Sequence, residues 1–115
     1  MRRKTELTLL QGTLDLLVLK ALEVGAQHGY GVARWVRERT SGAIEIEDGA
    51  LYTSLHRLER RGWVDSEWGV SENNRRAKYY ELTRSGRRRL AAEVTAWTRY
   101  AEAVFSVVGS NEAAS

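Results

Sequence analysis

Residues 48–82, DGALYTSLHRLERRGWVDSEWGVSENNRRAKYYEL, decide the fold of this 115-residue chain. The first part of the stretch predicts a short amphipathic helix, because its leucines recur at steps of three and four residues. These leucines are Leu51, Leu55 and Leu58. Asp48 is the expected N-cap, since its carboxylate can accept free amides of the first turn. Gly62 is the expected left-handed residue that ends the helix.

A β-hairpin is predicted directly after this helix. Residues 63–68 and 76–82 are the expected strands, and the second is rich in tyrosine. Residues 69–75 between them hold glycine, serine and two asparagines, which is typical of a loop. The hairpin therefore has a polar, basic tip.

Two more helices are predicted upstream. Thr8 and Gln11 match a capping box, and an apolar stripe follows at helical spacing until Gly25. The stripe consists of Leu10, Leu14, Leu17, Val18, Ala21 and Leu22. A shorter helix has the stripe Val32, Trp35 and Val36 and stops at Ser41 and Gly42. Residues 43–47 alternate apolar and acidic side chains, which predicts a very short strand.

A long helix is predicted over residues 84–108, with Thr83 as its cap and Gly86 as an early, weak member. It would span about 37 Å, more than the preceding unit can cover. Its apolar face would stay in water unless a partner covered it, and a two-fold homodimer also suits palindromic DNA. The expected dimer contacts are Leu90, Val94, Trp97, Ala101, Val104, Phe105 and Val108.

The order of these elements predicts a mainly α protein with a small β-hairpin wing, that is, a winged helix-turn-helix with a long C-terminal helix. We expect a winged helix-turn-helix DNA-binding domain over residues 1–83, a dimerisation helix over 84–108 and a disordered tail over 109–115.

Composition excludes several classes of protein. The chain has no cysteine, so disulfides, zinc–thiolate sites and thiol catalysis are excluded. No apolar run approaches the roughly 20 residues of a membrane span, and no signal-peptide pattern follows the basic N-terminus, so we expect a cytoplasmic protein. The net charge is only +3, but the arginines are clustered, which is typical of proteins that bind polyanions.

DNA is the expected partner of the short helix and of the hairpin tip. Small residues allow a helix to approach the major groove closely, hydroxyls can bond bases or phosphates, and arginine can grip guanine or phosphate. The expected helix contacts are Ala50, Thr53, Ser54, Arg57, Arg60 and Arg61. The hairpin tip is expected to contact flanking phosphates or the minor groove through Asn73, Asn74, Arg75, Arg76 and Lys78.

Several motifs, in their order and spacing, resemble the PadR family of bacterial transcriptional regulators, in particular its short subfamily with a single C-terminal dimerisation helix. They are Gln11-Gly12-Thr13-Leu14, His28-Gly29-Tyr30-Gly31-Val32, Gly49-Ala50-Leu51-Tyr52-Thr53-Ser54-Leu55, Arg57-Leu58-Glu59, Arg76-Ala77-Lys78-Tyr79-Tyr80 and Leu82-Thr83. The resemblance covers roughly residues 7–108. It implies a third helix that recognises DNA, a hairpin wing, a C-terminal helix that dimerises and, in many members, a repressor. It also implies that Tyr52 of the third helix contacts the DNA backbone.

The same resemblance implies a small-molecule effector. Some short members of the family look like sensors of planar aromatic compounds that bind between two subunits against a tryptophan, and Trp97 matches that position. Such a ligand site would be lined by Trp97, Leu14, Val94 and Ala101. The alternative is that the two Trp97 side chains only pack the dimer seam.

Other functions fit the sequence less well. A winged helix can also bind another protein without specific DNA binding. The two basic patches, one on the short helix and one at the hairpin tip, favour DNA instead. His28 and His56 are the only histidines, so no set of metal ligands is expected, and no cofactor is implied. No serine has a plausible histidine and acid beside it, so we expect no catalytic site and no enzyme.

Overall fold

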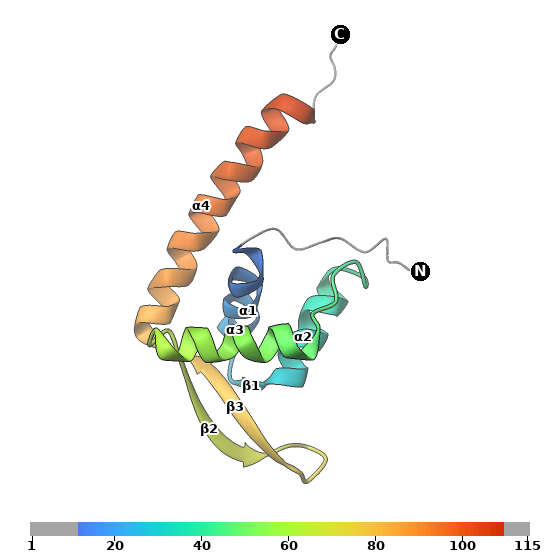
Figure 1. The fold of residues 1–115 in the computed structure, drawn as a ribbon, viewed down its shortest axis with the longest axis vertical. Coiled ribbons are helices and arrows are strands. Elements are labelled where there is room, and N and C mark those ends of the chain that lie inside the picture. Colours follow the sequence, from blue (N-terminus) through green and yellow to red (C-terminus); the bar gives the residue numbers. More distant parts are fainter. Residues whose placement is uncertain (1–11, 110–115) are drawn as a thin grey trace.

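The computed structural model describes residues 12–109. Three helices pack into a body, a hairpin hangs from it, and a long helix projects from the opposite side (Figure 1). The elements are α1 (Thr13–Glu23), β1 (Gln27–His28), α2 (Gly29–Arg39), α3 (Asp48–Arg60), β2 (Val64–Val70), β3 (Arg76–Leu82) and α4 (Arg84–Val108). The predicted winged helix-turn-helix with a long C-terminal helix is confirmed. Among the described residues, no helix is both long and apolar enough to cross a membrane.

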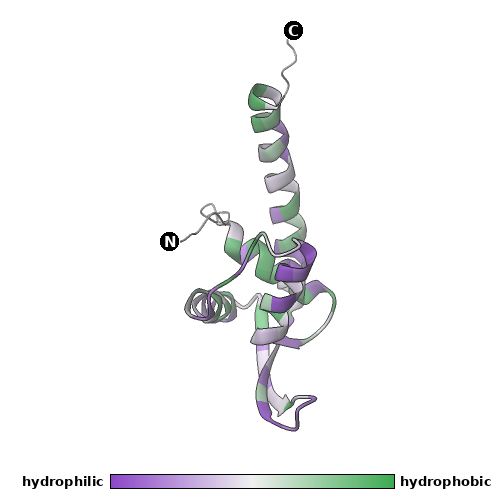
Figure 2. Ribbon diagram, turned by 90° about the vertical axis from the view of Figure 1, so that its right-hand side faces the viewer, coloured by the Kyte–Doolittle hydropathy of each residue, from purple (hydrophilic) through white to green (hydrophobic). Residues whose placement is uncertain are grey.

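The core lies between the three helices of the body. Apolar stripes of α1, α2 and α3 face one another there, and Tyr80 and Leu82 of β3 close the core from the wing side. Its helical members include Val18, Leu19, Leu22, Val32, Val36, Leu51, Leu55 and Leu58. The wing tip is hydrophilic, whereas hydrophobic segments occur in the body and at the far end of α4 (Figure 2). The apolar spacing in the sequence therefore identified the buried faces correctly.

The sheet has three strands with β3 in the middle. β2 pairs with β3 antiparallel over seven residues, from Val64 opposite Leu82 to Val70 opposite Arg76. On the other edge, β1 adds two pairs, Gln27 with Tyr80 and His28 with Tyr79. Because β1 and β2 occupy both edges of β3, residues 43–47 find no place beside it. The strand predicted there is wrong, and the alternation reflects only Ile44 and Ile46 packing on the core.

The helix ends agree with the sequence in part. Gly62 is left-handed with φ +77°, and Trp63 N–H donates to the Leu58 carbonyl, so the predicted end of α3 is confirmed. The predicted N-cap at Asp48 is wrong by one residue, because the Glu47 carbonyl accepts the first helical bond and Asp48 lies inside the first turn. The capping box at Thr8 and Gln11, and Leu10 of the first stripe, lie outside the described residues.

The start of α4 is tied tightly to the root of the wing. Thr83 caps the helix by accepting from Gly86 N–H, as predicted, and its hydroxyl donates to the Gly62 carbonyl at 2.7 Å. A methyl group on Gly86 would overlap the Trp63 carbonyl oxygen. Gly86 is therefore not a weak helix member but the residue that lets α4 approach the wing root.

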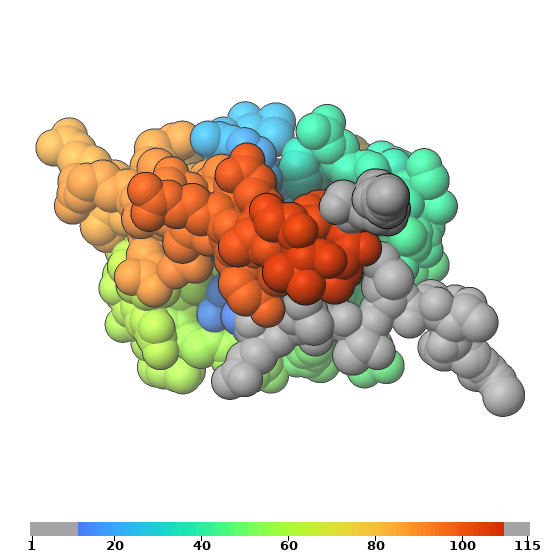
Figure 3. Space-filling model, turned by 90° about the horizontal axis from the view of Figure 1, so that it is seen from above, coloured from blue at the N-terminus to red at the C-terminus, as the bar shows by residue number. Residues whose placement is uncertain are grey.

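Only the base of α4 belongs to the core. Among the described residues of α4, Gly86 and Leu90 alone are buried, and the later turns stand clear of the body. Viewed from above, α4 lies on top of the other elements (Figure 3). Leu90 was expected to touch a partner, but it is 3% exposed and packs in the chain's own core. The exposed apolar row starts at Val94.

Candidate nucleic-acid interface

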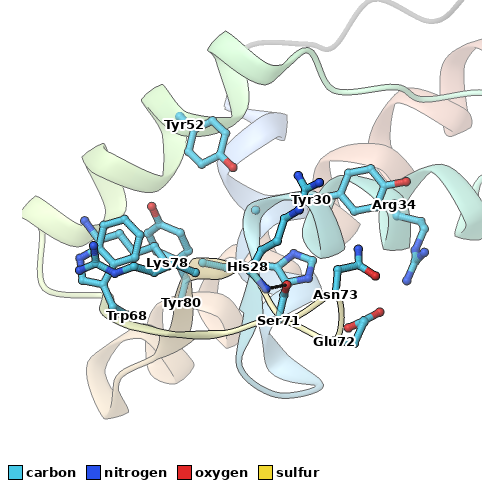
Figure 4. A pocket seen from close by; sticks show the side chains of 14 residues that line it. His28, Tyr30, Arg34, Tyr52, Trp68, Ser71, Glu72, Asn73, Lys78 and Tyr80 are labelled. Atoms are coloured by element: carbon cyan, nitrogen blue, oxygen red, sulfur yellow. Dashed lines mark hydrogen bonds between the residues drawn. The ribbon is translucent and has the colours of Figure 1, made fainter.

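A groove of about 740 Å³ opens between the wing, the N-terminal half of α3 and the β1–α2 junction (Figure 4). We call it the wing groove. Three segments far apart in the sequence meet in it, because β1 pairs with β3 and carries the start of α2 to the wing. Its lining residues are His28, Gly29, Tyr30, Arg34, Tyr52, Trp68, Ser71, Glu72, Asn73, Arg75, Arg76, Ala77, Lys78 and Tyr80.

The wing groove is strongly basic. Its lining holds four cationic side chains and a single carboxylate, that of Glu72. The cationic residues are Arg34, Arg75, Arg76 and Lys78. A concave surface with one sign of charge concentrates oppositely charged partners. A phosphate backbone is such a partner, and arginine and lysine are the residues that neutralise it.

The opposite face of the hairpin has the reverse charge. A second cavity of about 490 Å³ lies there and is lined by Glu59, Asp65, Glu67 and Glu81, with no lysine or arginine. The separation follows from strand geometry, because successive residues of β3 point to opposite faces. Lys78 therefore enters the wing groove, while Glu81 lies on the acidic side. A polyanion would be attracted to one face of the wing and repelled from the other.

Aromatic rings position the wing cations. The guanidinium of Arg76 lies 4.4 Å from the centre of the Trp68 ring, and the ammonium of Lys78 lies 6.0 Å from it. Across the groove, the Arg34 guanidinium lies 5.5 Å from the Tyr30 ring centre. Cation–π contacts limit the rotamers of these long side chains while leaving their N–H donors free. The groove thus offers its charges already partly ordered.

Tyr52 connects α3 to the wing groove. Its ring lies so close to Gly29 that a Cβ on that glycine would overlap the tyrosine hydroxyl. Gly29 thereby admits the ring to the groove wall, where 40% of Tyr52 remains exposed. Several residues predicted from the sequence are brought together here, namely Tyr52, Asn73, Arg75, Arg76 and Lys78. Asn74 lies exposed at the wing tip, and Ala50 and Thr53 are exposed on α3.

Two residues predicted to contact DNA instead face α1. Ser54 is fully buried and its hydroxyl donates to Asp15 Oδ1 at 2.6 Å, so the prediction of a DNA contact is wrong for this residue. Arg57 donates to the same carboxylate twice, from Nε to Oδ2 at 2.9 Å and from Nη2 to Oδ1 at 2.6 Å. No local pattern in the sequence indicates this contact, because Asp15 lies about forty residues away, on another helix.

Arg60 and Arg61 do not line the wing groove. They lie at the C-terminal end of α3, about 12 Å along the helix axis from Tyr52 at 1.5 Å per residue. The Arg61 guanidinium lies over the Trp63 ring, 5.4 Å from its centre, and Arg89 of α4 lies 4.6 Å from the same ring. The basic patch of α3 and the basic wing are therefore two separate surfaces.

Sequence reasoning missed the contribution of the β1–α2 junction. His28, Tyr30 and Arg34 line the wing groove, but none of the three is among the DNA contacts expected from the sequence. The available signal was two aromatic or imidazole rings and an arginine within seven residues at a helix start. It became informative only with β1, whose two residues pair with β3 and so bring the junction to the wing.

The Asp15 carboxyl is held in its ionised form. Burial by itself raises the pKa of Asp15, but the hydrogen bonds from Arg57 and Ser54 and the charges of Arg57 and Arg61 outweigh it, so the pKa lies below its usual value. The same contact raises the pKa of Arg57. A carboxyl whose folded-state pKa is depressed stabilises the fold above its unfolded-state pKa of about 3.9, and that stability is lost as the pH falls.

We expect Asp15→Asn to lower the free energy of unfolding by about 1–2 kcal/mol at neutral pH, because the pair is charged but still partly in solvent. The difference from the unaltered protein should shrink as the pH falls below about 3.9, the ordinary pKa of an aspartate, because protonation of the Asp15 carboxyl removes its contribution to the free energy of unfolding. Urea unfolding of both proteins at neutral pH and at an acid pH below that range measures this. An equal difference at both would show that the charge of Asp15 does not contribute.

Comparison with known proteins identifies relatives of this architecture. The model of the transcriptional regulator PadR-like family matches residues 18–92. A transcriptional regulator from Clostridium thermocellum has a TM-score of 0.77 and 26% identity, covering 85% of this chain and 95% of that one. A PadR family transcription regulator from Clostridium difficile has a TM-score of 0.70 and 31% identity, covering 83% and 96%.

One similar structure holds nucleic acid. Bacillus subtilis PadR, solved in complex with operator DNA, has a TM-score of 0.64 and 22% identity, covering 71% of this chain and 46% of that chain. At this identity the likeness shows a shared fold. The family match itself spans the body, the wing and the start of α4. The chain belongs to the transcriptional regulator PadR-like family.

Proposed function

We propose that this regulator binds operator DNA sequence-specifically and represses transcription from it in the cytoplasm. The observation that carries the proposal is the wing groove, which faces four cations toward one concave surface between the wing and α3. Bacillus subtilis PadR, which shares the fold, was solved with operator DNA, and this supports DNA as the polyanion. In this arrangement α3 enters the major groove and the wing holds the flanking backbone.

Binding to duplex DNA at increasing salt tests this proposal. Fluorescence anisotropy with a labelled duplex of about 30 base pairs measures the association constant. Its logarithm should fall linearly with the logarithm of the salt concentration, with a slope of about −0.9 for each neutralised phosphate. A site selected from a random library should bind more tightly than the random pool, and a promoter that contains it should be repressed in a reporter strain. Folded protein that binds no duplex at low salt would overturn the proposal.

We also propose that the protein acts as a homodimer through α4. The 25-residue helix leaves an apolar row uncovered after Leu90, with Val94 and Trp97 near its middle and Val104, Phe105 and Val108 further along. Trp97 and Val104 are each 40% exposed, and Phe105 is 66% exposed. Exposed apolar rows of this extent mark interaction sites. A second copy presents the same row, and a two-fold pair would place two wings on one duplex.

Val104→Asp is expected to convert the dimer to a monomer, because the new carboxylate would be buried against the partner's apolar row without a counter-charge. Sedimentation velocity measures the mass, and the circular dichroism of the monomer should still show the winged unit. Glu102→Asp, at an exposed polar position of the same helix, is the control and should remain dimeric. A monomeric unaltered protein, or a dimeric Val104→Asp variant, would contradict the proposed interface.

A planar aromatic effector is proposed to bind at this interface and release the DNA. Trp97 offers a large flat surface on the exposed side of α4, and Ala101 one turn later leaves space beside it. Leu14 of α1 and Val94 would complete the site, as α1 packs beside α4.

Planar cationic dyes are therefore expected to quench tryptophan fluorescence and to weaken DNA binding. Trp97→Ala should remove both effects. Trp68→Phe, which alters a wing tryptophan instead, should leave the dye-induced release of DNA in place. If Trp97→Ala is released by the dye as readily as the unaltered protein, the ligand does not bind there.

A further inference from the structure

The Asp15 carboxylate of α1 binds α3 on the side that faces the body of the protein. Asp15 accepts three hydrogen bonds from α3, one from Ser54 and two from Arg57, at 2.6 to 2.9 Å. Ser54 and Arg57 lie three residues apart, so both point toward α1 from one side of α3. The contact is largely enclosed, since 27% of the Asp15 side chain and 33% of the Arg57 side chain are exposed.

This contact determines which side of α3 is free. Each residue turns an α-helix by about 100°, so the residues one position before Ser54 and Arg57 lie on a neighbouring side. That side carries Gly49, Thr53, His56 and Arg60, all of them exposed. Open space lies around the position of a Cβ on Gly49. The outward side of α3 is thus about 100° around the axis from the side held by Asp15.

The contact with Asp15 opposes the release of Arg57 toward DNA. If Arg57 turned toward a phosphate, the partly buried Asp15 carboxylate would lose two of its three hydrogen bonds and its counter-charge and would keep only the bond from Ser54, which is costly in a protein interior. Arg76 and Lys78 of the wing have no such internal acid: among the described residues, no salt bridge involves either one. The arginine of α3 that looks best placed for DNA in the sequence is therefore the one already neutralised.

We propose that Asp15 is a positioning residue for DNA recognition: it withdraws Arg57 from the phosphate contacts and fixes the rotation of α3 that presents Thr53 and His56 to the duplex. This inference rests on the proposed function, and it specifies which cationic side chains of the chain contact the DNA phosphates. Because Asp15 holds Arg57, the number of phosphates that the protein neutralises should not depend on Arg57.

The salt dependence of binding to a random-sequence duplex of about 30 base pairs tests this, because its slope counts neutralised phosphates, at about 0.9 each. Arg57→Met should leave the slope unchanged, whereas the matched variant Arg76→Met should reduce it by about 0.9. Asp15→Asn should increase the slope by about 0.9, because the freed Arg57 reaches a phosphate, and Asp15→Asn with Arg57→Met should restore the original slope. Loss of stability alone would change the folded fraction and not the slope.

A spectroscopic measurement on the unaltered protein accompanies the slopes. On titration with the same duplex, the Nε–H resonance of Arg57 should stay in place while that of Arg76 shifts. The NMR titration and the slope of Arg57→Met together show whether Arg57 contacts a phosphate, even if Asp15→Asn does not fold. A slope reduced as much by Arg57→Met as by Arg76→Met, or a shifted Arg57 resonance, would overturn the positioning role while leaving DNA binding intact. Absence of binding by the unaltered protein would overturn the proposed function, and this inference with it.

Discussion

Gly86→Ala is expected to lower the free energy of unfolding by about 3 kcal/mol or more, near the upper end of overpacking substitutions. The added methyl group would overlap the backbone carbonyl oxygen of Trp63, and no side-chain rotation can relieve a clash with backbone. The start of α4 would have to move away from the wing root. That movement would break the hydrogen bonds from Thr83 and Ser85 to the Gly62 carbonyl.

Urea unfolding followed by helix circular dichroism measures this change. Gly49→Ala is the matched control, because Gly49 also lies in a helix but has open space around it. There the substitution should be neutral or stabilise by up to about 1 kcal/mol through helix propensity. A cost below about 1 kcal/mol for Gly86→Ala would show that α4 does not need its close approach to Trp63.

Replacing Arg75, Arg76 and Lys78 together by alanine is expected to weaken DNA binding by about 100-fold or more. Each charge-assisted contact to a phosphate contributes about 1–2 kcal/mol, and about 1.4 kcal/mol corresponds to a factor of ten. The salt slope should fall by about 2.7, for three phosphates no longer neutralised. All three residues line the wing groove, and Arg75 and Arg76 are exposed, so the fold should tolerate their loss.

A charge-matched variant provides the control. Arg84, Arg87 and Arg88 are exposed at the start of α4 and lie outside the wing groove. Their replacement by alanine removes the same three charges, so it reports the effect of net charge alone. Anisotropy titrations of both variants at one salt concentration give the comparison. Equal losses of affinity in the two variants would mean that the wing groove does not hold the DNA.

The features that could be predicted from the sequence depend on neighbouring residues. The leucine spacing of α3, the left-handed Gly62 and the capping hydroxyl of Thr83 are local signals, and each is found in the structure. The wing tip was also recognised, because its cations follow one another in the chain.

The features that were missed depend on residues distant in the chain. Two-residue β1 has no periodicity of its own and exists only through pairing with β3. Arg57 looks like a free cation until α1 brings Asp15 to it. Gly86 looks like a defect in a helix until the Trp63 carbonyl is placed beside it. In each case, tertiary packing decides the role of a residue whose local context points elsewhere.

The most direct test of the DNA interface is an amide NMR titration of the full chain with a short duplex. We predict that the largest shift changes fall on three segments that meet at the wing groove: the β1–α2 junction, the start of α3 around Tyr52, and the wing from Ser71 to Lys78. Changes centred on Asp65 and Glu67 of the acidic face, with the wing groove unchanged, would contradict the interface.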